Sequence, residues 1–326
     1  MRVLIVFSDN SAGGIDRYTF IKDQTDALIK IGCVIDFFGV QGKGILGYLK
    51  NYKSLRRKIK EFQPQIIHAH YGLCGLLANF QRKIPVVTTY HGSDINNKKN
   101  LKFSKIAIFL SKFNIFVSQK NIETAKPKKN FALIPCGVDT EMFKPMDKAE
   151  CRAKFGFGNN EKLVLFSSSF GNMVKNSALA QEAVNQLDNV KLIELKGYSR
   201  HEVAELMNAV DAVLMTSFTE GSPQFTKEAM AVNCPVVSTD VGDVKQTVKD
   251  VNNCYITTYE VNDVAEKLKK CLASNEKTNG REILITLSLD NKTIAEKILK
   301  IYLHNFSIQN NFINNRFGVR IGNIFY

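Results

Sequence analysis

Two glutamates eight residues apart, Glu220 and Glu228, have the type and the spacing to hold one elongated ligand. The apolar run at residues 212–216 predicts a buried strand just ahead of them. Ser222 is a favourable N-cap and Pro223 a favourable first helical residue, so a helix is expected to begin there. Glu228 then lies about 7.5 Å further along the axis of that helix. The pattern therefore places a helix N-terminus between two carboxylates.

The chemistry that this arrangement suits is the binding of a nucleotide-sugar. A helix N-terminus offers free N–H groups and a positive dipole end to a diphosphate. A carboxylate accepts hydrogen bonds from two hydroxyls, which suits a diol of a ribose or a hexose. A nucleotide-sugar carries a sugar, a diphosphate and a ribose in a line. Glu220, Glu228 and the phosphate-facing turn between them match that order, and the turn is formed by Gly221, Ser222 and Pro223.

The elements that position these residues form two series of alternating strands and helices, separated by a break at residues 135–145. The first series has expected strands at 2–8, 33–39, 65–70, 84–90, 114–118 and 131–134, with helices at 16–31 and 46–62. The second has strands at 162–167, 190–195, 212–216 and 235–238, with helices at 177–187, 202–209, 223–232, 261–273 and 289–303. This alternation predicts parallel sheets covered on both faces, with ligand crevices at the carboxyl ends of the strands.

The stretch from Glu220 to Glu228, followed by the run 234–242, resembles the E-x7-E motif of the retaining GT-B glycosyltransferases of family 4. The resemblance implies an α/β fold of two Rossmann-like doubly wound domains that face a central cleft. Residues 1–140 would bind the acceptor and residues 146–290 the nucleotide-sugar. Residues 291–305 would form a helix crossing back to the first domain, and 306–326 a tail. Glu220 would contact the transferred sugar and Glu228 the ribose hydroxyls.

Further residues match this family one by one. Gly13 and Gly14 resemble its N-terminal glycine loop, which lets backbone approach the donor phosphate or the acceptor; a tight strand-to-helix turn is a compatible alternative. His91, in the segment 90–94, would hydrogen-bond the donor sugar near the reacting carbon. His68 and His70 are expected to line the cleft.

The diphosphate side of the site departs from the family at one position. Lys175 resembles the lysine that binds the diphosphate, and hydroxyls such as that of Ser169 are expected to assist it. Phe170 stands where the family usually has an arginine, so Lys175 and the helix N-terminus would carry more of the diphosphate's charge. Tyr198 is expected either to stack on the nucleobase or to be an ordinary surface tyrosine. With Glu220 and His91, Lys175 completes the predicted catalytic set.

Composition and charge limit the remaining possibilities. The 326 residues favour two domains, and seven cysteines without a C-x-x-C pair indicate free thiols in a reducing compartment. Residues 1–150 hold 24 Lys and Arg against 12 Asp and Glu, so nearly all of the net charge of +13 lies there. This asymmetry indicates an anionic partner such as a membrane surface, or else simply solvated helix faces. A strand-like start and the absence of a membrane-length apolar run predict a cytoplasmic protein. Peripheral attachment to the inner face of the membrane is compatible with this prediction.

The predicted activity is retaining transfer of a sugar from a UDP- or GDP-sugar to a glycan or polyprenyl-diphosphate-linked acceptor in surface polysaccharide biosynthesis. No Asp-x-Asp motif is present, which predicts catalysis without a metal or another cofactor. Two alternatives stay open: a nucleotide-sugar 2-epimerase on the same fold, and a non-catalytic nucleotide-sugar-binding subunit. Nucleic-acid binding is excluded because the basic clusters lack interleaved stacking aromatics.

Overall fold

The computed structural model describes residues 1–10, 14–274 and 278–317, which divide by their contacts into two compact units. Unit 1 takes Met1–Val117, Asn121–Ile134 and the chain from Ala295 onward. Unit 2 takes Ser118–Lys120 and Pro135–Ile294. Each unit is built on one parallel sheet, so the predicted fold class of two parallel-sheet α/β domains is confirmed.

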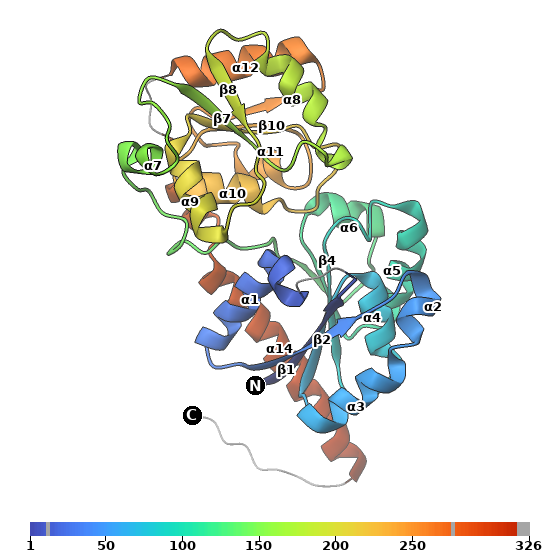
Figure 1. The fold of residues 1–326 in the computed structure, drawn as a ribbon. Helices are drawn as coiled ribbons and strands as arrows, with labels where there is room; N and C mark the ends of the chain where they lie inside the picture. The colour runs from blue at the N-terminus through green and yellow to red at the C-terminus, as the bar shows by residue number, and fades with distance from the viewer. Residues whose placement is uncertain (11–13, 275–277, 318–326) are drawn as a thin grey trace. The chain divides into compact units, whose positions relative to one another are not determined.

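The sheet of unit 1 has six parallel strands in the order β2-β1-β3-β4-β5-β6. Figure 1 labels three of them, β1, β2 and β4. The strands are β1 (Arg2–Ser8), β2 (Val34–Val40), β3 (Ile66–His70), β4 (Val86–Tyr90), β5 (Phe113–Phe116) and β6 (Phe131–Leu133). The helices are η1 (Gly14–Arg17), α1 (Thr19–Lys30), α2 (Gly44–Leu49), α3 (Tyr52–Phe62), α4 (Gly72–Asn79), α5 (Lys98–Leu110), α6 (Gln119–Ala125) and α14 (Asn291–Phe317).

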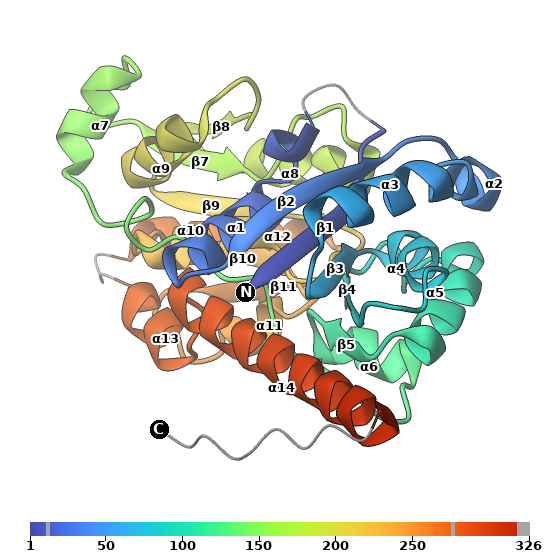
Figure 2. The ribbon, with the colours of Figure 1, turned by 90° about the horizontal axis from the view of Figure 1, so that it is seen from below.

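Side chains of each strand alternate between the two faces of this sheet, and this alternation sorts the helices into two layers. Leu4, Val6 and Ile67 face a core shared with α2, α3 and α4. His68 points the other way and contacts Tyr302 of α14. Figure 2 shows α1 with α14 on one side and α2 to α5 on the other. The strand order reverses between β1 and β3, where a doubly wound sheet opens its ligand crevice.

Unit 2 has five parallel strands in the order β11-β10-β9-β7-β8. They are β7 (Lys162–Phe166), β8 (Val190–Ile193), β9 (Ala212–Met215), β10 (Val236–Thr239) and β11 (Tyr255–Thr257). The helices are α7 (Lys148–Lys154), η2 (Met173–Lys175), α8 (Ser177–Val184), α9 (Arg200–Ala209), α10 (Gln224–Ala231), α11 (Val244–Thr247), α12 (Val261–Ala273) and α13 (Gly280–Thr286). Residues of β7 alternate between the two faces of the sheet. On one face they pack in a core with α8 and α12, and on the other in a core with α9 and α10.

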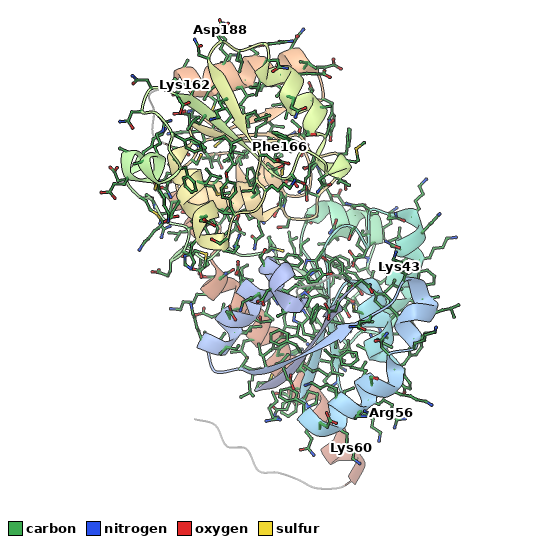
Figure 3. The ribbon with its side chains drawn as sticks, in the orientation of Figure 1. Lys43, Arg56, Lys60, Lys162, Phe166 and Asp188 are labelled. Atoms are coloured by element: carbon green, nitrogen blue, oxygen red, sulfur yellow. The ribbon has the colours of Figure 1, made fainter. Side chains whose placement is uncertain are left out.

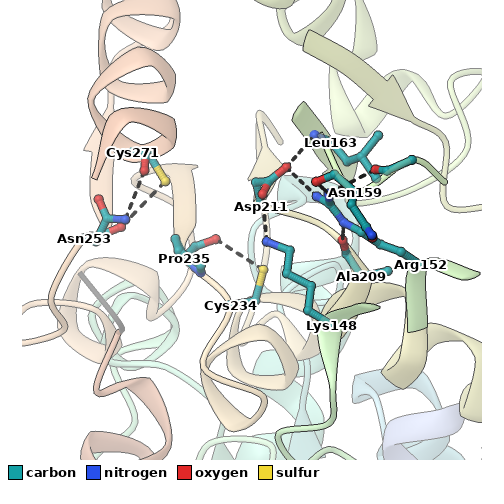
Figure 4. A network of polar contacts seen from close by, with 11 residues as sticks. Lys148, Arg152, Asn159, Leu163, Ala209, Asp211, Cys234, Pro235, Asn253 and Cys271 are labelled. Carbon is teal, nitrogen blue, oxygen red and sulfur yellow. Dashed lines mark hydrogen bonds and ion pairs between the residues drawn. The ribbon is translucent and has the colours of Figure 1, made fainter. Parts of the chain in front are cut away.

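A polar network ties α7 to the amino-terminal edge of this sheet (Figure 4). One carboxylate, that of Asp211, accepts hydrogen bonds from Leu163 N–H at 2.7 Å and from Arg152 Nη2 at 3.0 Å, and pairs with Lys148 Nζ at 2.7 Å. Arg152 is buried and also donates to carbonyl oxygens, among them that of Ala209. The amino ends of β7 and β9 are thereby fixed together, so their carboxyl ends lie side by side as well.

Several elements differ from those predicted. The helix expected at 46–62 is two helices, because the Asn51 side chain turns back to bond Gln41 and Gly47 between them. The expected helix at 16–31 begins as η1 and continues as α1. The last helix, α14, runs from Asn291 to Phe317, past the predicted end at residue 305 and into the segment expected as a tail. All seven cysteines are free, as predicted.

Candidate functional site

The loops that follow β7 and β9 meet at the point where the strand order of unit 2 reverses, which is where such sheets bind ligands. Lys175 ends η2 in the first loop, and Glu220 lies in the second. The Lys175 Nζ and Glu220 Oε1 atoms are 2.5 Å apart, with side chains 21 % and 16 % exposed. Thr216 Oγ1 donates to the carbonyl oxygen of Lys175 at 3.0 Å and so joins the two loops. The sheet therefore brings these two predicted site residues into contact.

The turn after Glu220 leads into α10, which begins at Gln224 with Pro223 as its N-cap. The expectation that Ser222 caps this helix is wrong, because the Ser222 hydroxyl donates instead to Asp243 Oδ2 at 2.7 Å. Gly242 has φ of +58°, and a Cβ there would lie 2.6 Å from the carbonyl oxygen of Gly221. Only glycine allows this approach, which holds the turn against the loop after β10.

Lys227 is buried beneath the same turn, and the sequence did not mark it. Its side chain is 0 % exposed, and its Nζ pairs with Asp243 Oδ2 at 2.7 Å. The same ammonium also bonds the Ser222 hydroxyl and, at 3.3 Å, the carbonyl oxygen of Cys136. A buried charge needs such a set of partners to be tolerated. Lys227 and Asp243 therefore form a buried ion pair that fixes the position of the turn.

Glu228 lies on α10 and is paired with a second cation that sequence reasoning missed. Arg200 Nη1 is 2.6 Å from Glu228 Oε1, and the guanidinium carbon lies 4.7 Å from the ring centre of Phe143. Arg200 is the first residue of α9, whose N-terminus Ser199 and Glu202 close with a capping box. The signal available in the sequence was its place two residues after Tyr198, the tyrosine that was expected near the nucleobase.

Three other predicted residues of unit 2 have neighbours that define their environment. Phe170 packs its ring 5.6 Å from that of Phe166 in the core, so an apolar contact occupies the position of the family's arginine. The carbonyl oxygen of Ser169 accepts a hydrogen bond from the N–H of Asn172 in the loop before Lys175. Tyr198 packs edge-on against Phe155 at 5.9 Å beside the core. Tyr198 is therefore partly engaged in packing.

In unit 1, three histidines gather at the carboxyl ends of β3 and β4. His70 Nδ1 lies 2.9 Å from His91 Nε2, and the ring of His70 also stacks on that of His68 at 4.4 Å. Both nitrogens of His68 are taken, by Tyr302 Oη at 2.5 Å and by Thr89 Oγ1 at 2.7 Å. His68 thus joins β3 to α14, while His70 and His91 form a pair that shares one proton between the two nitrogens.

Asp94 holds the segment that carries His91. Its carboxylate accepts N–H bonds from His91 at 3.0 Å, Gly92 at 3.1 Å and Gly72 at 2.9 Å. The role of this aspartate is therefore to fix the backbone beside the histidine. Gly14 has φ of +56°, which favours glycine at the turn after β1, and Gly13 lies outside the described residues.

Burial controls the protonation of this cluster. It lowers the pKa of His68 and His91 to about 3, and burial with the neighbouring imidazoles lowers the pKa of His70 well below its ordinary value. Burial also raises the pKa of Asp94 to about 6 against the effect of its N–H bonds. All three imidazoles are therefore neutral at pH 7, so each has one N–H donor and one acceptor nitrogen.

Lowering the pH from 7 to 5 is expected to reduce the melting temperature of the protein. The unfolded chain binds protons on these histidines below about pH 6.5, whereas the folded unit does so only near pH 3, so their stabilisation is lost as the pH falls through that window. Asp94 has the opposite effect on stability between about pH 6 and 4, because its pKa is raised on folding. The three histidines outnumber this single carboxyl group, so the net effect is a loss of stability. Thermal unfolding at pH 7, 6 and 5 measures how steeply the melting temperature changes with pH, and His70→Gln should make this dependence shallower. An identical slope in His70→Gln and wild type would contradict the assignment.

Comparison with known proteins adds to this geometry. The family described as Glycosyltransferase Family 4 matches residues 6–142, and the family described as Glycosyl transferases group 1 matches residues 162–274. The chain belongs to the family 4 glycosyltransferases. This glycosyltransferase is 28 % identical over 220 residues to TuaC of Bacillus subtilis, which is named as a teichuronic acid biosynthesis glycosyltransferase. That match covers 57 % of this chain and 56 % of TuaC, so the chain spans little more than half of that relative's length.

Solved structures show the GT-B fold that the sequence predicted for this glycosyltransferase. Sucrose-phosphate synthase from Thermosynechococcus elongatus superposes with a TM-score of 0.79 at 18 % identity, covering 94 % of this chain and 100 % of that one. Anabaena Alr3699/HepE in complex with UDP superposes with a TM-score of 0.72 at 18 % identity, covering 92 % and 99 %. Within the described part of the glycosyltransferase, no helix is long and apolar enough to cross a membrane.

Proposed function

We propose that this glycosyltransferase transfers a hexose, with retention of configuration, from a UDP- or GDP-sugar to a glycan or polyprenyl-diphosphate-linked acceptor in surface polysaccharide biosynthesis. The observation that carries the proposal is the contact of Lys175 with Glu220 at the switch point of the sheet, beside the turn that leads into α10. The name of TuaC supports the polysaccharide context, and the UDP complex of Alr3699/HepE supports the class of donor.

The residues of unit 2 take roles that follow from their chemistry. Lys175 and the N–H groups at the start of α10 bind the diphosphate, and they stabilise the negative charge that develops on it as the bond from the sugar carbon to the phosphate oxygen breaks. Glu220 accepts hydrogen bonds from sugar hydroxyls, and Glu228 from the ribose. Arg200 holds the Glu228 carboxylate in place and adds the positive charge that Phe170 does not supply.

The reaction needs no protein nucleophile in this proposal. The acceptor oxygen bonds to the anomeric carbon on the face that the diphosphate leaves, and the acceptor's proton passes to an oxygen of the departing diphosphate. His91, in unit 1, hydrogen-bonds the donor sugar near that carbon, and His70 fixes which His91 nitrogen bears the proton. We also propose that the reaction proceeds without a metal ion.

Thermal unfolding with UDP, GDP and ADP, followed by turnover assays, tests this function. One of these nucleotides at about 100 times its Kd is expected to raise the melting temperature by about 5 °C or more. The matching nucleotide-sugar should be consumed only when a saccharide or lipid-linked acceptor is present, with EDTA leaving the rate unchanged. Interconversion of the nucleotide-sugar without an acceptor would instead establish an epimerase, and binding without turnover of any acceptor a binding subunit. Activity lost with EDTA and restored by Mn²⁺ would overturn metal independence.

A further inference from the structure

One helix of unit 1, α5, presents a basic and apolar face to solvent. Its exposed residues recur at helical spacing and form what we call the α5 outer face: Lys98, Lys99, Lys102, Lys105, Ile106 and Phe109. The Phe109 side chain is 85 % exposed and that of Ile106 is 48 % exposed. The helix contains no acidic residue, and no ion pair of its lysines occurs in the part of the chain that the structure describes.

The orientation of this face is fixed by tight packing on the opposite side of α5. A Cβ placed on Gly72 of α4 would lie 2.0 Å from Ser104 Oγ, so the two helices touch where glycine allows it. Ala107 is also buried on that side. Asn97 caps the start of the helix by accepting N–H bonds from Lys99 and Asn100. The exposure of Phe109 is therefore set by a well-anchored helix.

The same helix is tied to the segment that carries His91. Ser104 Oγ donates to the carbonyl oxygen of Asp94 at 2.8 Å, and Asn100 Nδ2 donates to that of Ser93 at 3.2 Å. Whatever contacts the α5 outer face is thus held at a fixed distance from the histidine cluster.

We infer that the α5 outer face docks on an anionic lipid bilayer, with Phe109 and Ile106 among the headgroups and the lysines against lipid phosphates. A phenylalanine that is almost wholly exposed is costly in water, and a helix with basic residues beside aromatic and aliphatic ones is typical of an interfacial helix. Other basic side chains on the α2 to α5 side of unit 1, among them Lys43, Arg56 and Lys60, also point to solvent (Figure 3). Their charge complements an anionic membrane.

A second copy of this chain is the less suitable occupant. A two-fold interface brings the same patch of both copies together, so the lysines of this face would meet one another with no carboxylate between them. The inference deepens the proposed function, on which it rests, because a polyprenyl-linked acceptor is reached only at a membrane surface.

Sedimentation of the full chain with vesicles tests the inference. Vesicles of phosphatidylcholine with about one third phosphatidylglycerol are expected to bind the wild type at low salt, and pure phosphatidylcholine vesicles are not. Phe109→Ser should lower the partition constant about tenfold. Lys102→Glu with Lys105→Glu should lower it about 25-fold or more, since each lysine contributes roughly fivefold near an anionic surface.

Ile29→Ser is the matched control, because Ile29 is also 48 % exposed but lies on α1, on the other side of the sheet. It should leave partitioning unchanged, whereas Ile106→Ser should weaken it. Wild-type protein that ignores anionic vesicles, or Phe109→Ser that binds them as well as wild type, would overturn the inference. So would a dimer in light scattering that Phe109→Ser dissociates. The nucleotide-induced rise in melting temperature should survive in every variant, which separates failure of this inference from failure of the proposed function.

Discussion

Replacing Lys227 with methionine is expected to lower the free energy of unfolding by about 3–5 kcal/mol, because the Lys227 side chain is fully buried in an ion pair. Methionine has a similar length but no charge, so the Asp243 carboxylate would stay buried without its cation. The Ser222 hydroxyl would also lose one of its three partners, which are Asp243, Lys227 and the N–H of Cys136. Urea unfolding followed by circular dichroism measures the loss.

The same substitution at an exposed pair is the control for this prediction. Lys267 pairs with Asp263 at 2.8 Å on α12, with both side chains more than a quarter exposed, so Lys267→Met should cost less than 1 kcal/mol. Adding Asp243→Asn to Lys227→Met should recover part of the loss, because the uncompensated charge is then gone. If Lys227→Met costs no more than Lys267→Met, the buried pair does not stabilise the turn before α10.

Much of the fold could be predicted because buried parallel strands are nearly continuous apolar runs. The strand predicted at 2–8 is β1, and those predicted at 65–70 and 162–167 match β3 and β7 to within a residue. Burial has the opposite effect on the prediction of a helix, and helix α4 was missed. Its residues 72–79 are almost all buried, so the helix has no polar face to produce a helical period. The three-residue β11 was likewise too short to recognise.

Local sequence motifs predicted which residues belong to the candidate site, but not which of them contact one another. Glu220, Glu228 and Lys175 could be named from their motif and turn. Their contacts depend on the order of strands in the sheet, because Lys175 follows β7 and Glu220 follows β9, and these strands are neighbours only in space. The pairing of Arg200 with Glu228 and the burial of Lys227 against Asp243 join segments that no local pattern connects. Long-range packing therefore supplied what the sequence could not.

The largest effect on activity is expected from Lys175→Met, which should lower kcat by about 10²–10³-fold. With Phe170 packed against the core, the ammonium of Lys175 is a cation next to Glu220 and the diphosphate in the proposed site. Its contribution grows as negative charge develops on the leaving diphosphate, so kcat should fall more than the affinity for the nucleotide. Initial rates at saturating donor, compared with the nucleotide Kd from calorimetry, separate the two quantities.

Two comparisons decide what a loss of activity in Lys175→Met means. Lys269→Met, at an exposed position on α12, should keep full activity and shows that removing a unit-2 lysine is not harmful in general. Lys175→Arg should recover part of the rate, because it restores a cation at the same loop, whereas a role in packing alone would favour methionine over arginine. A kcat for Lys175→Met within threefold of wild type would remove this lysine from the catalytic set. The charge on the leaving group would then have to be met by the α10 N-terminus and Arg200, the cation that pairs with Glu228.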